Sequence, residues 1–120
     1  MPMARKISTD DGRAALAAVS GVDKPARTDL ATAVRYLLQL LAEKAPGNSV
    51  EVRVPPFGAV QVVEGPRHTR GTPPNVVEMD AATWIAVATG IESWVDAAAS
   101  GRVHASGTRA DLAGLLPLRP

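Results

Sequence analysis

Residues 78–116 read EMDAATWIAVATGIESWVDAAASGRVHASGTRADLAGLL, and regularly spaced glycines divide this stretch into short segments. Gly90, Gly101 and Gly107 each follow a run about as long as one helix or strand. Glycine suits the left-handed residue that ends a helix, because it has no Cβ to clash with the backbone. The spacing therefore predicts a helix ending at 89–90, a second helix ending at 100–101, a strand over 102–106 and a final helix up to 116.

Helix-capping residues precede the three predicted helices. Asp80 stands before the first, Ser93 with Asp96 opens the second, and Thr108 with Asp111 opens the third. A serine or threonine followed three residues later by an acid satisfies amide groups that a helix start leaves without partners. These aspartates are therefore interpreted as caps rather than as catalytic acids.

Two helices and three strands are predicted upstream. Ser8 can cap a short helix over 10–20, and a longer helix over 28–45 carries leucines at helical spacing. From residue 48 the apolar period changes to two, which is typical of a half-buried strand over 48–54. Further strands are expected over 57–64 and 76–79. The result is an α+β domain whose sheet of four or five strands is covered by helices.

Length and composition restrict the class of protein. The chain has 120 residues, 46% of them hydrophobic, with one Phe, one Tyr and two Trp, so its core must be aliphatic. We expect an N-terminal arm with a short helix over 1–27 and one domain over 28–120. A net charge of +1 gives no general electrostatic reason to expect nucleic acid as a partner. No apolar run resembles a signal peptide or a transmembrane segment, so a cytoplasmic protein is expected.

Signatures of catalysis and of cofactor or metal binding are missing from the sequence. There is no cysteine, and the two histidines, His68 and His104, have no close companion beyond Glu64, which leaves a zinc site short of ligands. The sequence contains neither a G-x-S-x-G elbow nor a phosphate-binding glycine motif. We therefore predict a protein that is not an enzyme and holds neither cofactor nor metal.

The irregular segment over 65–75, GPRHTRGTPPN, is the main polar candidate. Arg67, His68 and Arg70 lie in it with no acidic residue among them, and paired guanidiniums suit a carboxylate or phosphate. A solvated loop stiffened by prolines is the structural alternative, although its length favours a function. Trp84 and Trp94 are candidates for the walls of an apolar pocket, with core packing as the alternative.

The glycine-punctuated stretch resembles the C-terminal half of sterol-carrier-protein (type two) domains. Its segment GRVHASGT at 101–108 is similar to a family motif, with Thr108 where an acid or asparagine is usual. VEVRVPPFGAVQ at 50–61 and EGPRHTRGTPPNVVE at 64–78 resemble a small actinobacterial branch of that family. The resemblance covers about 29–116.

This resemblance implies a five-stranded sheet with helices on one side, enclosing an apolar tunnel for a fatty acid, acyl lipid or similar ligand without covalent chemistry. It implies a tunnel lining of Leu37, Leu41, Val60, Val62, Trp84, Leu112 and Leu115. Arg67, His68 and Arg70 would then hold an anionic head group. The alternative hypothesis is a non-enzymatic interaction module that uses the 65–75 loop to contact another protein.

Overall fold

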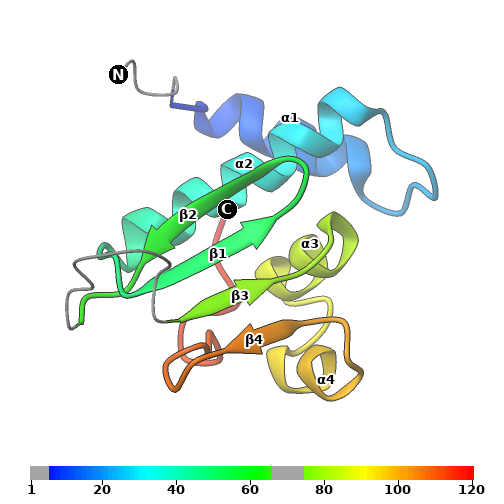
Figure 1. Cartoon of the computed structure of the whole chain (residues 1–120). Helices are drawn as coiled ribbons and strands as arrows, with labels where there is room; N and C mark the ends of the chain where they lie inside the picture. Colours follow the sequence, from blue (N-terminus) through cyan, green and yellow to red (C-terminus); the bar gives the residue numbers. More distant parts are fainter. Residues whose placement is uncertain (1–5, 66–74) are drawn as a thin grey trace.

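The computed structural model describes residues 6–65 and 75–120, which form four helices and four strands (Figure 1). The helices are α1 (Thr9–Val19), α2 (Arg27–Lys44), α3 (Ala81–Thr89) and α4 (Trp94–Ala99). The strands are β1 (Val50–Val54), β2 (Gly58–Val62), β3 (Val76–Glu78) and β4 (His104–Ser106). The predicted α+β class is confirmed, and most of the predicted boundaries hold to within a few residues.

The sheet is mixed and has the strand order β2-β1-β3-β4. β1 pairs antiparallel with β2 and parallel with β3, and β3 pairs antiparallel with β4. Within the described residues the sheet therefore has four strands, and the expected count of about five is wrong. The resemblance implied five strands, whereas the apolar patterning alone predicted four or five.

The helices cover one face of the sheet, with α2 behind β1 and β2 in Figure 1. Val50, Val52 and Val54 of β1 are fully buried on that face, while Glu51 and Arg53 lie on the opposite one. The same alternation gives β2 and β3 their inward positions. The leucine-rich face of α2 completes the core, and the indole nitrogen of Trp84 donates a hydrogen bond to the Val34 carbonyl, 3.2 Å away.

Caps and glycines define α3 and α4 as predicted. The Asp80 carboxylate accepts from the Thr83 amide at 2.8 Å, and the Ser93 hydroxyl accepts from the Asp96 amide at 3.1 Å. Gly90 and Gly101 have φ angles of 83° and 81°, a region that glycine adopts without steric cost. The regular punctuation of this stretch therefore marks real helix ends.

The predicted helix over 108–116 is wrong, because this segment forms turns. Asp111, expected to complete a helix cap, instead accepts a hydrogen bond from the Ala113 amide at 2.8 Å, which favours a local turn over a helix. Leu112 is nevertheless fully buried, and the Leu118 amide donates to the Ala88 carbonyl at 2.7 Å. Leu112 and Leu118 therefore hold the C-terminal segment, residues 107–120, against the core and α3 although it forms no helix.

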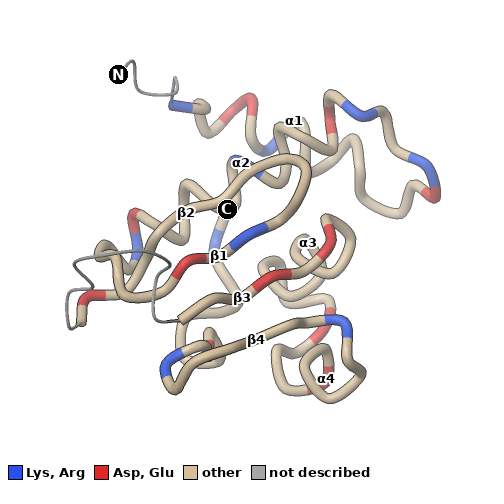
Figure 2. Tube along the Cα trace, in the orientation of Figure 1, with Lys and Arg blue, Asp and Glu red and all other residues tan. Residues whose placement is uncertain are grey.

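Charged side chains of both signs are spread over the chain (Figure 2). Glu92, after α3, pairs with Arg102, before β4, and one of their hydrogen bonds measures 2.7 Å. This hydrogen bond lowers the pKa of the Glu92 carboxyl and raises the pKa of the Arg102 guanidinium. Any contribution of the pair to stability is therefore present at neutral pH and is lost as acidification protonates Glu92.

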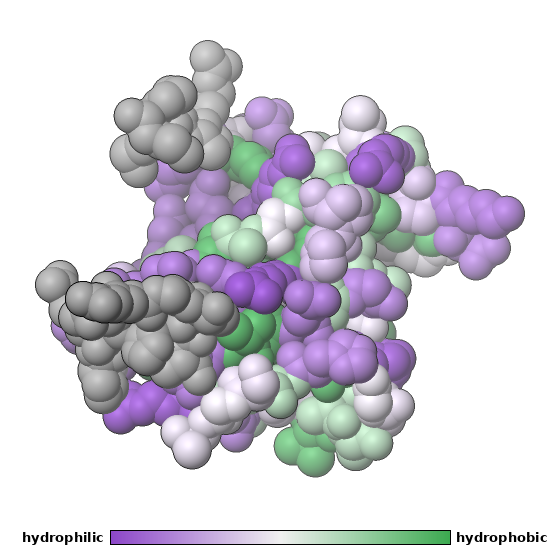
Figure 3. Space-filling model, viewed as in Figure 1, coloured by the Kyte–Doolittle hydropathy of each residue, from purple (hydrophilic) through white to green (hydrophobic). Residues whose placement is uncertain are grey.

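Apolar side chains are also exposed near α4, where Figure 3 shows green atoms at the lower right. Val95 of α4 is 66% exposed, and Ile91, in the segment between α3 and α4, is 78% exposed. No helix among residues 6–65 and 75–120 is long and apolar enough to cross a membrane.

Close packing of α1 on α2 leads to the first prediction. Gly12 of α1 is buried, and a Cβ atom there would overlap the ring of Tyr36, which is itself buried in α2. Overpacking costs about 1–3 kcal/mol, more than the ~0.5–1 kcal/mol that alanine gains over glycine in a helix. Gly12→Ala should therefore lower the free energy of unfolding measured in urea.

The exposed Gly114 provides a matched control, because a Cβ there meets no atom within 4 Å. Gly114→Ala should leave the urea midpoint nearly unchanged. Equal stability of Gly12→Ala and the unmodified protein would show that α1 is not tightly seated on α2.

Candidate functional site

An apolar groove of about 340 Å³ lies between α2 and the edge strand β2. The helix contributes Arg35, Leu38 and Gln39, and the strand contributes residues 58–60. Phe57, which precedes β2, and Ile7, which precedes α1, complete the lining. The volume falls within the range of ~300–1,000 Å³ that is usual for small-molecule sites.

Cations are concentrated around Phe57. The Arg35 Nε donates to the Phe57 carbonyl at 2.7 Å, and the Arg27 guanidinium carbon lies 5.2 Å from the centre of the Phe57 ring. One of the five N–H donors of Arg35 is used in this way, and the others belong to its exposed guanidinium. An apolar groove with a guanidinium on its wall can hold an apolar chain that carries an anionic group.

Gly58 leaves space in the groove. It lies opposite Val54 on the helix-covered face of the sheet. A Cβ built there would lie 3.4 Å from the Leu38 Cδ1 and 3.7 Å from the Arg35 Cγ, which are ordinary contacts. Any longer side chain at this position would therefore extend toward α2 and into the groove.

Most of the side chains expected to line a tunnel lie in the hydrophobic core. Leu37, Leu41, Val62, Trp84 and Leu112 are fully buried and belong to one packed cluster. Val60 and Leu115 are half-buried and pack against that cluster. The structure thus brings all seven residues together, and Val60 is the one that also lines the groove beside α2.

The predicted anion-binding residues Arg67, His68 and Arg70 lie outside the described residues.

The flanks of the 65–75 segment are held by buried polar groups. The Asn75 side chain donates to the Ser49 carbonyl at 2.8 Å and accepts from the Arg109 amide at 2.9 Å. The Ser49 hydroxyl donates to the Val63 carbonyl at 2.6 Å. Val63, whose φ of 67° is unusual for a β-branched residue, is thereby fixed at the end of β2.

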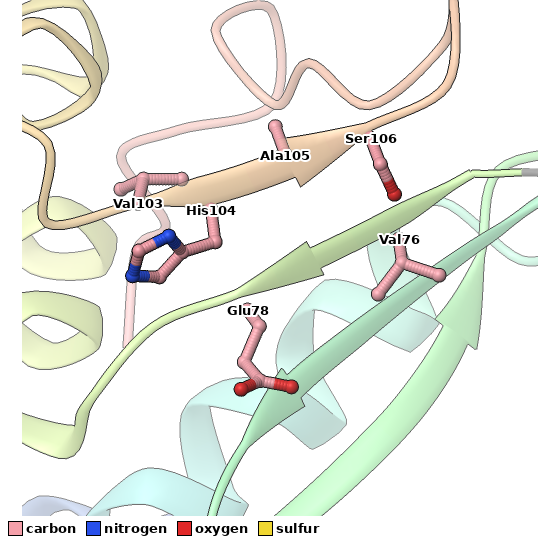
Figure 4. Close-up of a pocket in the computed structure, with 6 residues that line it drawn as sticks. All are labelled: Val76, Glu78, Val103, His104, Ala105 and Ser106. Atoms are coloured by element: carbon pink, nitrogen blue, oxygen red, sulfur yellow. The ribbon is translucent and has the colours of Figure 1, made fainter.

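The uncovered face of the sheet has a second, more open hollow of about 450 Å³ along β3 and β4. Glu78 and His104 are cross-strand neighbours there, and both project from this face, with the Glu78 carboxylate extending toward β1 (Figure 4). His104 is exposed on β4. Among the described residues no group of three or more acidic or histidine side chains could hold a metal ion.

The fold is thus an α+β sandwich of one mixed sheet and one helical layer, with an apolar groove where the two layers meet. Residues 26–118 match the family described as "Bacterial SCP ortholog", a sterol-carrier-protein-like bacterial family, and the chain belongs to it. The resemblance found in the sequence is therefore confirmed. A search of curated proteins found no match.

Of the residues that line the groove, the sequence prediction named Val60 and missed Ile7, Arg35, Leu38, Gln39, Phe57, Gly58 and Ala59. Three of these are polar or lack a side chain, so a search for apolar periodicity passes over them. Ile7 is held beside the groove by its hydrogen bond to Gln39, which lies 32 positions further along the chain. The available signal was the single Phe, followed at once by a glycine on the inward face of a strand.

Asn75 is the residue on which the polar contacts around the 65–75 segment depend. It is 3% exposed, so replacing it by alanine leaves the Ser49 carbonyl and the Arg109 amide without this partner. An unsatisfied buried polar group costs about 1–3 kcal/mol. Asn75→Ala should therefore lower the free energy of unfolding by about that amount in urea denaturation. Asn48→Ala, at an exposed position, is the control, and an equal effect of both would refute the anchoring role.

Proposed function

We propose that the protein is a non-catalytic lipid-binding or carrier protein that holds a single acyl chain in the groove between α2 and β2. Membership of a sterol-carrier-protein-like family supports an apolar ligand. The observation that carries the proposal is the groove itself, which lies between sheet and helices and is lined by Leu38, Phe57 and Val60. Each ligand methylene buried there contributes about 0.8 kcal/mol.

The proposed ligand has an anionic head group, because Arg35 is the charged side chain in this lining. A charge-assisted hydrogen bond to a guanidinium is roughly twice as strong as a neutral one. Arg67, His68 and Arg70 remain the proposed contacts of a head group that reaches the 65–75 segment. The six clustered residues other than Val60 remain a proposed extension of the lining. We also retain as proposals that the protein is cytoplasmic and that it binds another protein.

Filling the groove tests the proposed function. Gly58→Leu should lower the affinity for a fluorescent fatty acid by roughly tenfold or more, since excluding about two methylenes loses ~1.6 kcal/mol. Gln61→Leu adds leucine at an exposed position on the opposite face of the same strand and should bind like the unmodified protein. Mass spectrometry of the purified protein should also detect co-purified acyl lipids. No uptake and no co-purified lipid would refute the function.

Arg35 tests the nature of the head group. Arg35→Gln should lower the affinity for a long-chain fatty acid by roughly tenfold, because a hydrogen bond to a charged group contributes about 1.5–3 kcal/mol. The affinity for the fatty alcohol of the same length should change little. Arg53→Gln, on the opposite face of the sheet, is the control in the same titrations. Equal losses for acid and alcohol would show that Arg35 supports the groove without recognising the anion.

A further inference from the structure

The backbone of Ile7 is held by a side chain rather than by a neighbouring strand. The Ile7 amide donates to Gln39 Oε1 at 2.9 Å, and Gln39 Nε2 donates to the Ile7 carbonyl at 2.9 Å. The carboxamide of Gln39 thus satisfies both backbone groups of one residue, as a neighbouring strand would do. We call this pair of hydrogen bonds the Gln39 clamp.

The clamp positions an apolar wall of the groove. Ile7 is half-buried and lines the groove together with Leu38, Phe57 and Val60. The preceding Lys6 adds an ion pair of 3.1 Å with Glu43, one turn further along α2. Both partners of that ion pair are largely exposed, so it contributes little. The position of this wall therefore depends mainly on one glutamine side chain.

The residues that follow are anchored separately. Ser8 caps α1, and α1 is seated on α2 through Gly12 and Tyr36. Ile7 can therefore leave the groove while α1 stays in place. Because the clamp consists of two ordinary hydrogen bonds at a partly exposed position, its opening is a small local event compared with unfolding.

We infer that Ile7, held by the Gln39 clamp, forms a gate at the groove between α2 and β2. An acyl chain enters and leaves when the clamp opens, and Ile7 covers the bound chain when the clamp closes. This inference rests on the proposed function, since it assigns to Gln39 the control of ligand exchange at the same site. Admission and release share the opening step, so both rates follow the fraction of open molecules.

Stopped-flow measurements with cis-parinaric acid, a fatty acid that fluoresces when bound, test the gate. Gln39→Ala should raise the association and dissociation rates together, each by roughly tenfold, the change expected when two ordinary hydrogen bonds are lost. The Kd should change much less than either rate. Gln39→Glu keeps the size of the side chain and an acceptor for the Ile7 amide but removes the donor to the Ile7 carbonyl, so it should raise both rates by a smaller factor than Gln39→Ala. Gln61→Ala, at an exposed glutamine outside the groove, should behave like the unmodified protein.

Amide hydrogen exchange at Ile7 gives an independent readout, because exchange of this amide requires the clamp to open. It should quicken in Gln39→Ala by about the same factor as the ligand rates. Unchanged ligand rates despite faster exchange at Ile7 would overturn the gate alone. Faster dissociation with unchanged association would also overturn it, since Ile7 would then be only a ligand contact. Failure of the unmodified protein to bind the probe would overturn the gate and the proposed function together.

Discussion

The leucines of α2 and the inward valines of β1 belong to one hydrophobic core, and this shared interface is the interaction on which the rest of the structure depends. β1 is bonded to a strand on each side, and all three of its inward side chains are fully buried beneath the helical layer. Burying a Val or Leu side chain contributes about 1.5–3 kcal/mol, so this interface accounts for much of the stability of a small domain. The face of β1 that is buried against the helices also decides which face of the other strands is covered. β2 lies at the edge of the sheet beside α2, and the groove lies between these two elements.

The features of the fold that depend on local periodicity were predictable from the sequence. The valine alternation of β1 and the leucine spacing of α2 each fit one period only, and the caps at Asp80 and Ser93 formed as expected. The tail was mispredicted because leucines at helical spacing satisfy two structures equally well. A helix would bury them on one side, but turns seated on α3 bury Leu112 just as completely. The hydrogen bond from the Ala113 amide to the Asp111 carboxylate favours the turns over the helix, because it competes with a helix start.

The candidate site was less predictable for a physical reason. The most apolar positions are drawn to the centre of the core, as Leu37, Leu41 and Trp84 show. A groove open to solvent forms instead where apolar packing stops, so its lining mixes partly polar residues such as Arg35 and Gln39 with small ones such as Gly58. These residues come together only through tertiary contacts. The Ile7–Gln39 contact joins two segments that have no shared pattern in the sequence.

For the proposed acyl ligand, a lateral groove beside Ile7 would be a less costly site than an empty interior tunnel. At about 24 cal/mol per Å³, a cavity of the groove's volume in the core would cost roughly 8 kcal/mol when unoccupied. That is comparable with the whole stability of a typical domain, ~5–15 kcal/mol. The fully buried leucines of α2 can therefore stay packed whether or not ligand is present. In the proposed mechanism only the Gln39 clamp has to open for exchange, so the control of binding would lie on the surface of α2, outside the core that maintains the fold.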